Sequence, residues 1–158
     1  MSPVMCVEDD ENDALFLKRA FRKAGIVNPL HVVSNGQEAI DYLGPAGTSL
    51  DDPLPCLVLL DLNLPGRPGL EVLQWIREQP QFYTLPVIIL SASNKDCDIH
   101  LCYEKGANAY LIKPSSAETL NVIAGSVRDF WLTHNSMPPN CAVMKRATGQ
   151  QNCRMTAL

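Results

Sequence analysis

The chain has 158 residues, of which 46% are hydrophobic and 19% are charged; this composition describes one folded domain and excludes a disordered chain. No apolar run approaches the roughly 20 residues that a membrane span needs, and no signal segment opens the sequence, so we expect a cytoplasmic protein with no membrane partner. Residues 1–137 carry a net charge of −7, because they hold all 17 acidic residues but lack Lys145, Arg146 and Arg154 of the 13 basic ones, and such an acidic body argues against binding to nucleic acid.

Five short aliphatic runs recur along the chain, and none of them alternates with polar residues. They occupy residues 4–7, 30–33, 56–60, 87–90 and 109–112. Strands that are apolar throughout are buried on both faces, which is the usual condition of a parallel sheet covered by helices. We therefore predict five parallel strands.

Segments with helical spacing separate these runs and follow the last one. The first has apolar residues at positions 14, 17, 21 and 24 and stops at Gly25. The last opens with Ser115-x-x-Glu118, which has the spacing of a capping box. Three more helices are predicted between them, at residues 36–43, 70–79 and 95–105. The apolar stripe of the last helix is formed by Leu120, Ile123, Val127, Phe130 and Trp131.

The alternation of strands and helices predicts one α/β domain over residues 1–137, with a doubly wound, five-stranded parallel sheet and helices on both faces. We expect the flavodoxin-like strand order 2-1-3-4-5. The remaining residues, 138–158, are fewer than the roughly 40 that a domain needs to fold unaided. For this segment we expect a flexible tail and no output domain.

Polar residues stand where four of the predicted strands end. Glu8 and Asp9 follow the first strand, Asp61 the third, Ser91 the fourth and Lys113 the fifth. In open sheets of this kind, the site lies outside the carboxyl ends of the strands, where the strand order reverses. The first and third strands would be neighbours about 5 Å apart, so we expect the three carboxylates to converge.

Converging carboxylates repel one another by about 3 to 4 kcal/mol per pair, so a cation must offset them. Oxygen ligands favour Mg²⁺ or Mn²⁺. Lys113 would supply a second cation, and a group held by both cations would be an anion, most simply a phosphoryl group. An aspartate beside a metal, a lysine and a hydroxyl suits an aspartyl phosphate, with Asp61 as the nucleophile.

Four motifs at these strand ends, VEDD, LLDLNLP, ILSAS and YLIKP, resemble the receiver domain of two-component response regulators, and the resemblance runs over residues 4–132. It implies that Asp61 accepts a phosphoryl group from a sensor histidine kinase. It also implies a Mg²⁺ site to which Asp61 belongs. Asp9 would bind the ion directly, Glu8 through water, and Asn63 through its backbone carbonyl.

The same resemblance implies roles for three further residues. Lys113 would pair with the phosphoryl group, Ser91 would hydrogen-bond it, and Tyr110 would be the switch aromatic that turns inward when Ser91 moves. The Lys113–Pro114 peptide bond would be cis. Such a protein passes its signal to a downstream protein or a phosphotransfer partner. It is not an enzyme, because it catalyses only its own phosphorylation and dephosphorylation.

Finer features resemble one subgroup of the family. The stretch GIVNPLHVVSNGQEAIDYL, the loop PAGTSLDDPLP and the segment RDFWLTHNSMPP are similar to the small single-domain regulators associated with cyanobacterial and bacterial phytochrome kinases. This resemblance implies a phytochrome-type kinase as partner. It also implies a homodimer through the side formed by the fifth strand and the last helix.

Two other functions fit the same strand ends. One is a receiver fold that binds partners without being phosphorylated. The presence of the acidic pair, Asp61 and Lys113 argues against this function. An Asp-nucleophile phosphatase also uses an aspartate at a strand end and Mg²⁺. Its second acidic residue is replaced here by Asn63, which cannot transfer a proton to a leaving group.

Overall fold

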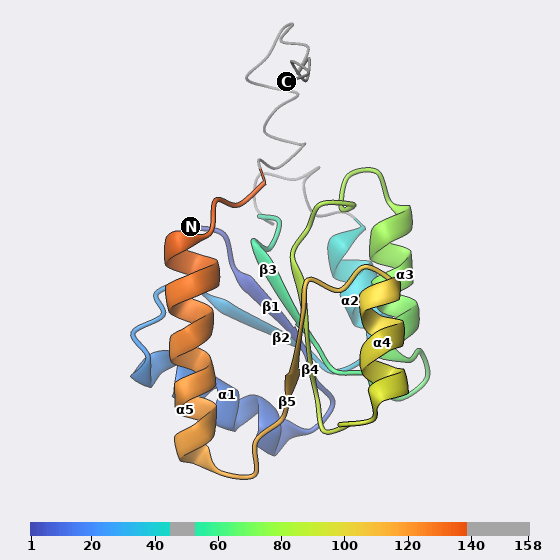
Figure 1. Ribbon diagram of the computed structural model, residues 1–158. Helices are drawn as coiled ribbons and strands as arrows, with labels where there is room; N and C mark the ends of the chain where they lie inside the picture. The colour runs from blue at the N-terminus through green and yellow to red at the C-terminus, as the bar shows by residue number, and fades with distance from the viewer. Residues whose placement is uncertain (45–52, 139–158) are drawn as a thin grey trace, which may run out of the picture.

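The computed structural model describes residues 1–44 and 53–138, in which strands and helices alternate along the chain (Figure 1). The strands are β1 (Val4–Val7), β2 (Leu30–Val33), β3 (Leu57–Leu60), β4 (Val87–Ser91) and β5 (Ala109–Ile112). The helices are α1 (Glu11–Lys23), α2 (Gly36–Leu43), α3 (Gly69–Glu78), α4 (Asp96–Glu104) and α5 (Ala117–Ser126), which continues into the π-helix η1 (Val127–His134). Apart from residue 138, the predicted tail lies outside the described residues.

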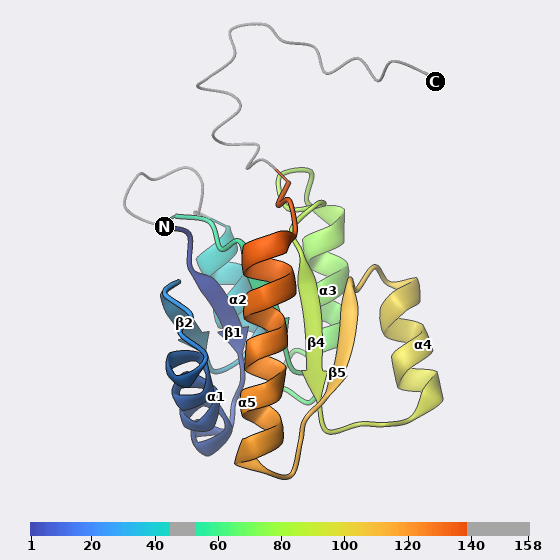
Figure 2. The ribbon, with the colours of Figure 1, turned by 60° about the vertical axis from the view of Figure 1, so that its left-hand side comes forward.

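The five strands form one parallel sheet in the order β2-β1-β3-β4-β5, which confirms the predicted fold. Figure 2 shows α1 and α5 together on the near face of the sheet, α2 and α3 behind it, and α4 beside β5. This order makes β1 and β3 neighbours, with Val7 paired to Leu60. The residues that follow these two strands therefore emerge next to each other.

Burial of both faces explains why the central strands read as continuous apolar runs. Every residue of β1, β3 and β4 is buried. Met5 and Val7 belong to the core beneath α2 and α3, whereas Val4 and Cys6 belong to the core beneath α1 and α5. Successive side chains of a strand point to opposite faces, so a central strand with two covered faces has no position for a polar residue until it ends.

The start of α5 and its apolar stripe differ from the prediction. The N-cap is Ser116, whose Oγ accepts a hydrogen bond from the Thr119 amide at 3.1 Å, so the predicted box at Ser115 is wrong. The stripe is also divided: Trp131 packs on the core beneath α1 and α5, whereas Phe130 is 58% exposed. Phe130 thus lies on the solvent side of η1, although it is adjacent in sequence to a residue that packs on the core. The other predicted elements agree with the structure to within one or two residues at each end.

Arg77, near the end of α3, joins the loops that lead into β4 and β5. Its guanidinium donates to the carbonyl oxygens of Gly106 (2.9 Å), Tyr83 (3.2 Å) and Leu85 (2.8 Å) and to Asn108 Oδ1 (2.9 Å). Gly106 has φ +95°, and a Cβ there would lie 3.0 Å from the Arg77 Nε, so the turn needs glycine for its backbone conformation and for the room that Arg77 takes. This network fixes the loops at the amino ends of β4 and β5, opposite the carboxyl ends of the strands.

None of the helices in the described ranges has the length and apolar character required to cross a membrane.

We expect Arg77→Ala to lower the free energy of unfolding by about 2 to 4 kcal/mol, because it removes four hydrogen bonds and leaves partly buried carbonyl groups without a donor. Urea denaturation measures the change. Arg19→Ala, at an exposed position of α1, is the matched control and should change stability by less than about 0.5 kcal/mol. Equal losses in the two variants would contradict the proposed role of Arg77.

Candidate functional site

Three carboxylates gather where β1 and β3 end. Glu8 and Asp61 are buried, with 6% and 5% of their surface exposed, and Asp9 is exposed. Each side chain has one carboxylate oxygen that lies within 4.8 Å of a carboxylate oxygen of each of the other two. The sheet order produces this cluster, because the amide of Asp61 bonds to the carbonyl of Val7 directly before Glu8. The structure thus brings together the three residues predicted to converge.

Gly69 holds the end of β3 close to the start of α3. Its amide donates to the carbonyl of Leu62 at 3.0 Å, and a Cβ at this position would lie 1.9 Å from the carbonyl oxygen of Asp61. Any larger residue would push the α3 terminus away from the strand end. The second glycine of the sequence PGRPG, Gly69, therefore permits the tight loop that fixes Asp61.

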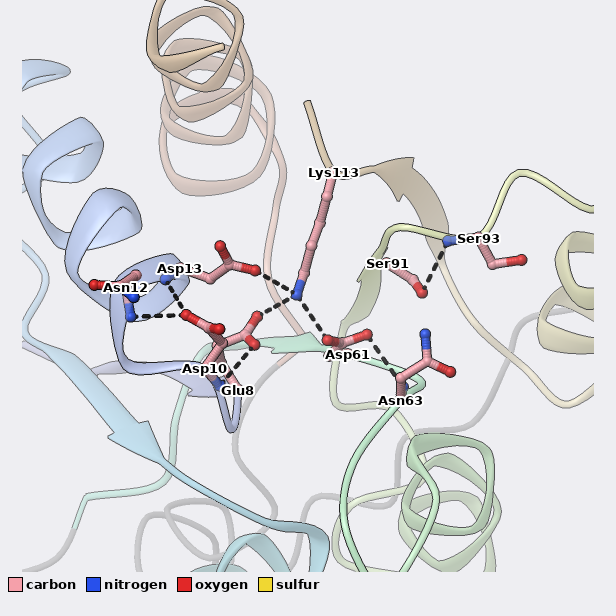
Figure 3. Close-up of polar contacts among 9 residues, drawn as sticks. All are labelled: Glu8, Asp10, Asn12, Asp13, Asp61, Asn63, Ser91, Ser93 and Lys113. Atoms are coloured by element: carbon pink, nitrogen blue, oxygen red, sulfur yellow. Dashed lines mark hydrogen bonds and ion pairs between the residues drawn. The ribbon is translucent and has the colours of Figure 1, made fainter. Parts of the chain in front are cut away.

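Lys113 enters the cluster from the end of β5, and its ammonium group lies among three carboxylates (Figure 3). Lys113 Nζ is 2.6 Å from Glu8 Oε2, 2.7 Å from Asp61 Oδ2 and 3.0 Å from Asp13 Oδ2. The described residues contain no cis peptide bond, so the expected cis bond before Pro114 is wrong. The trans form is the more stable isomer of an X–Pro bond by about 0.5 to 1 kcal/mol, and Lys113 reaches the cluster from it.

Burial and ion pairing shift the pKa values of Glu8 and Lys113 in opposite directions. Burial raises the pKa of Glu8 above its ordinary value, although the hydrogen bond from Lys113 acts against this rise. Burial alone would lower the pKa of Lys113, but the hydrogen bonds to Asp61 and Glu8 outweigh it and raise that pKa above its ordinary value. Lys113 is therefore a cation throughout the physiological pH range.

Asp13 is the residue of this cluster that the sequence analysis missed. It lies in the first turn of α1, whose N-cap Asp10 accepts hydrogen bonds from the amides of Asn12 (2.8 Å) and Asp13 (3.0 Å). In the sequence, a carboxylate in the first turn of a helix is explained by its favourable interaction with the helix dipole, so it does not indicate a site. Its position three residues beyond the cap, at the helix end nearest the strand ends, is the signal that could have revealed it.

The other predicted site residues lie on the same edge of the sheet. Ser91 is fully buried, and its Oγ accepts a long hydrogen bond from the Ser93 amide at 3.4 Å. The Asn63 amide donates to Asp61 Oδ1 at 3.2 Å. The Tyr110 hydroxyl donates to the Ser93 carbonyl at 2.9 Å, which ties the aromatic ring to the loop between β4 and α4. The loop that follows Ser91 of β4 is thus hydrogen-bonded to Tyr110 of β5 through Ser93.

A groove of about 460 Å³ opens beside Lys113, between α1 and the loop that leads into α5. Glu8, Asp13 and Lys113 form its polar end, and Phe16 and Leu120 contribute to its apolar walls. A reactant that enters along this groove reaches the ammonium group of Lys113 at its polar end. Lys113 is therefore accessible to a second molecule from this groove.

The donor set suits a hard divalent cation. The gathered atoms are carboxylate oxygens without a histidine or cysteine ligand among them, which is the set that Mg²⁺ and Mn²⁺ favour. Lys113 offsets only part of the negative charge of Glu8, Asp9, Asp13 and Asp61. Asp9 makes no ion pair with any residue of the described ranges, so its carboxylate is available as a ligand.

Comparison with known proteins agrees with this geometry. A family model described as the response regulator receiver domain matches residues 4–124. The probable methanogenesis regulatory protein FilR2 of Methanothrix harundinacea is 36% identical over 138 residues, which cover 85% of this chain and 86% of FilR2. Response regulator Rcp1 of Synechocystis is 31% identical over 135 residues, which cover 85% of this chain and 92% of Rcp1.

Solved structures show the same fold. The Mn²⁺-bound form of Rcp1 superimposes with a TM-score of 0.79 at 30% identity and covers 88% of this chain and 100% of that one. The phosphorylated cyanobacterial phytochrome response regulator RcpA gives a TM-score of 0.80 at 32% identity, with 87% of this chain and 99% of that one covered. Both similarities extend over nearly the whole of the described fold.

We expect Lys113→Met to raise the affinity for Mn²⁺ by about tenfold or more, because the ammonium group competes with the ion for the oxygens of Glu8 and Asp61. Titration calorimetry of the folded variant measures the affinity. Lys95→Met, at an exposed position before α4, removes the same charge outside the cluster and should change the affinity by less than about twofold. Unchanged or weaker binding by Lys113→Met would show that the lysine does not compete with the ion.

Proposed function

Because the chain belongs to the response regulator receiver domain family, we propose that it accepts a phosphoryl group on Asp61 from a sensor histidine kinase and thereby switches a protein-interaction surface. One observation carries this proposal: the ammonium group of Lys113 joins the buried carboxylates of Glu8 and Asp61 at the open edge of the sheet. A buried carboxylate beside a fixed cation, at the carboxyl edge of the sheet, suits a nucleophile that receives an anionic group.

The proposed reaction moves one phosphoryl group. A carboxylate oxygen of Asp61 attacks the phosphorus atom, so that an O–P bond forms and the N–P bond to the kinase histidine breaks, with the electron pair remaining on the imidazole. Lys113 offsets the charge of the incoming group. A Mg²⁺ ion held by Glu8, Asp9, Asp61 and the Asn63 carbonyl would neutralise charge on the phosphoryl oxygens.

The proposed switch passes through the loop between β4 and α4. A phosphoryl oxygen would be a strong, charged hydrogen-bond acceptor for the hydroxyl of Ser91, whose Oγ accepts a long hydrogen bond of 3.4 Å from the Ser93 amide in this structure. Movement of Ser91 toward the phosphoryl group would shift Ser93, to which the Tyr110 hydroxyl is bonded. Tyr110 would follow and alter the surface formed by α4 and β5. Phosphorylation favours this state only through its differential contacts.

The proposed partners follow from the relatives. RcpA is a phytochrome response regulator, and by analogy we propose a phytochrome-type kinase as the partner of this chain. We also propose a cytoplasmic location. A downstream protein or phosphotransfer partner receives the signal, with residues 1–137 as the receiver unit and residues 138–158 as a tail. Hydrolysis of external phosphoesters is not favoured, because the position two residues after Asp61 is Asn63.

A homodimer through β5 and the α5–η1 helix is the remaining part of the proposal. Large apolar side chains are exposed on both elements: Ile112 is 48% exposed on β5, Val122 is 68% exposed on α5, and Phe130 is 58% exposed on η1. β5 is also an edge strand, whose outer backbone groups have no neighbouring strand within the described sheet. Burial of such side chains against a second copy would stabilise a dimer.

We expect wild-type protein incubated with acetyl phosphate and Mg²⁺ to gain the mass of one phosphoryl group, and Asp61→Asn to gain none, because the amide is not a nucleophile. Intact-protein mass spectrometry measures the gain. Asp41→Asn, at an exposed position of α2, makes the same change elsewhere and should be labelled like wild type. Labelling of Asp61→Asn would move the acceptor to another residue, and no labelling of folded wild type would favour binding without phosphorylation.

We expect Val122→Glu to weaken the dimer of the phosphorylated protein by at least about tenfold, because a charge would be buried in the interface. Sedimentation equilibrium measures the dissociation constant. Val27→Glu places the same charge at a position that is 73% exposed between α1 and β2, outside the proposed interface, and should leave the dimer intact. If both variants dimerise like wild type, the interface lies elsewhere.

A further inference from the structure

The ammonium group of Lys113 has no spare donor in this structure. A lysine ammonium carries three N–H groups. Three carboxylates contact it, at 2.6 Å (Glu8), 2.7 Å (Asp61) and 3.0 Å (Asp13). A phosphoryl group on Asp61 would bring new acceptor oxygens to the same place. Lys113 can donate to them only if it releases one of its present partners.

Burial determines which partner is released most easily. The side chain of Glu8 is 5% exposed, so its carboxylate would lose a charged partner where water cannot replace it. The contact of Lys113 with Asp61 would pass to the phosphoryl group that Asp61 carries, so a second phosphoryl oxygen would displace either Glu8 or Asp13. The side chain of Asp13 is 46% exposed, and its contact is the longest of the three. Water would hydrate a released Asp13 carboxylate, and the N-terminus of α1 would also stabilise its negative charge. Asp13 is therefore the partner with the smallest penalty for release.

We infer that Asp13 is a positioning residue that holds Lys113 in the unphosphorylated protein and is replaced there by the phosphoryl group. This inference rests on the proposed function and adds a competing contact to it. Because Asp13 and the phosphoryl group use the same N–H donor, the carboxylate lowers the affinity of the site for the phosphoryl group. It also keeps the ammonium group directed at the cluster before a donor arrives.

Beryllofluoride, which mimics a phosphoryl group on aspartate, tests the competition in the presence of Mg²⁺. We expect Asp13→Ala to bind it roughly two- to fivefold more tightly than wild type, the range set by an exposed ion pair. Glu11→Ala is the matched control, because Glu11 is an exposed carboxylate in the same first turn of α1 and forms no ion pair with any described residue. The control should bind like wild type.

The ¹⁵N resonance of Lys113 Nζ distinguishes a direct contact from a general effect of charge. We expect wild type and Asp13→Ala to differ in this resonance before beryllofluoride is added and to coincide afterwards, because the contact exists only in the first state. A difference of equal size in both states, or none in either, would overturn the inference. So would equal affinities of Asp13→Ala and Glu11→Ala. Failure of wild type to bind beryllofluoride would instead overturn the proposed function.

Discussion

The contact of Lys113 with Glu8 and Asp61 is the interaction on which the rest of the site depends. Two buried carboxylates with oxygens within 4.8 Å of each other repel by about 3 to 4 kcal/mol at an effective dielectric constant near 20, and the ammonium group that contacts both offsets that repulsion. The sheet order places β1 beside β3, Gly69 permits the tight loop after β3, and Lys113 arrives from the end of β5. Removing any one of these features would separate the charges that the fold brings together.

The same edge of the sheet connects this charged cluster to a surface. Ser91 ends β4 beside Asp61, Ser93 follows it in the loop, and Tyr110 of β5 bonds to the Ser93 carbonyl. Hydrogen bonds thus connect Ser91 to Ser93 and Ser93 to Tyr110, and in the proposed switch a change of charge at Asp61 would act on these residues rather than across the core. β5 lies at the edge of the sheet, where its side chains are only partly buried, so its surface can change without repacking the central strands.

The fold could be predicted because burial on both faces leaves a plain pattern of apolar strands that end in polar residues. The placement of the acidic pair, Asp61, Ser91 and Lys113 at the strand ends could be predicted for the same reason. Asp13 was missed because contacts between a helix turn and a lysine one hundred residues later depend on helix placement, which apolar periodicity does not specify. The exposure of Phe130 and the cap at Ser116 depended likewise on how α5 is rotated and where it begins, and a one-residue shift decides both.

Chemical identification of the modified residue tests the central claim, that the charge arrangement makes Asp61 the phosphoryl acceptor. Borohydride reduces an aspartyl phosphate to homoserine, and peptide mass mapping then locates the change in otherwise unaltered protein. We expect homoserine at position 61 and aspartate at positions 9, 10 and 13. Homoserine at one of those three positions, or a phosphoryl group that borohydride does not remove, would contradict it.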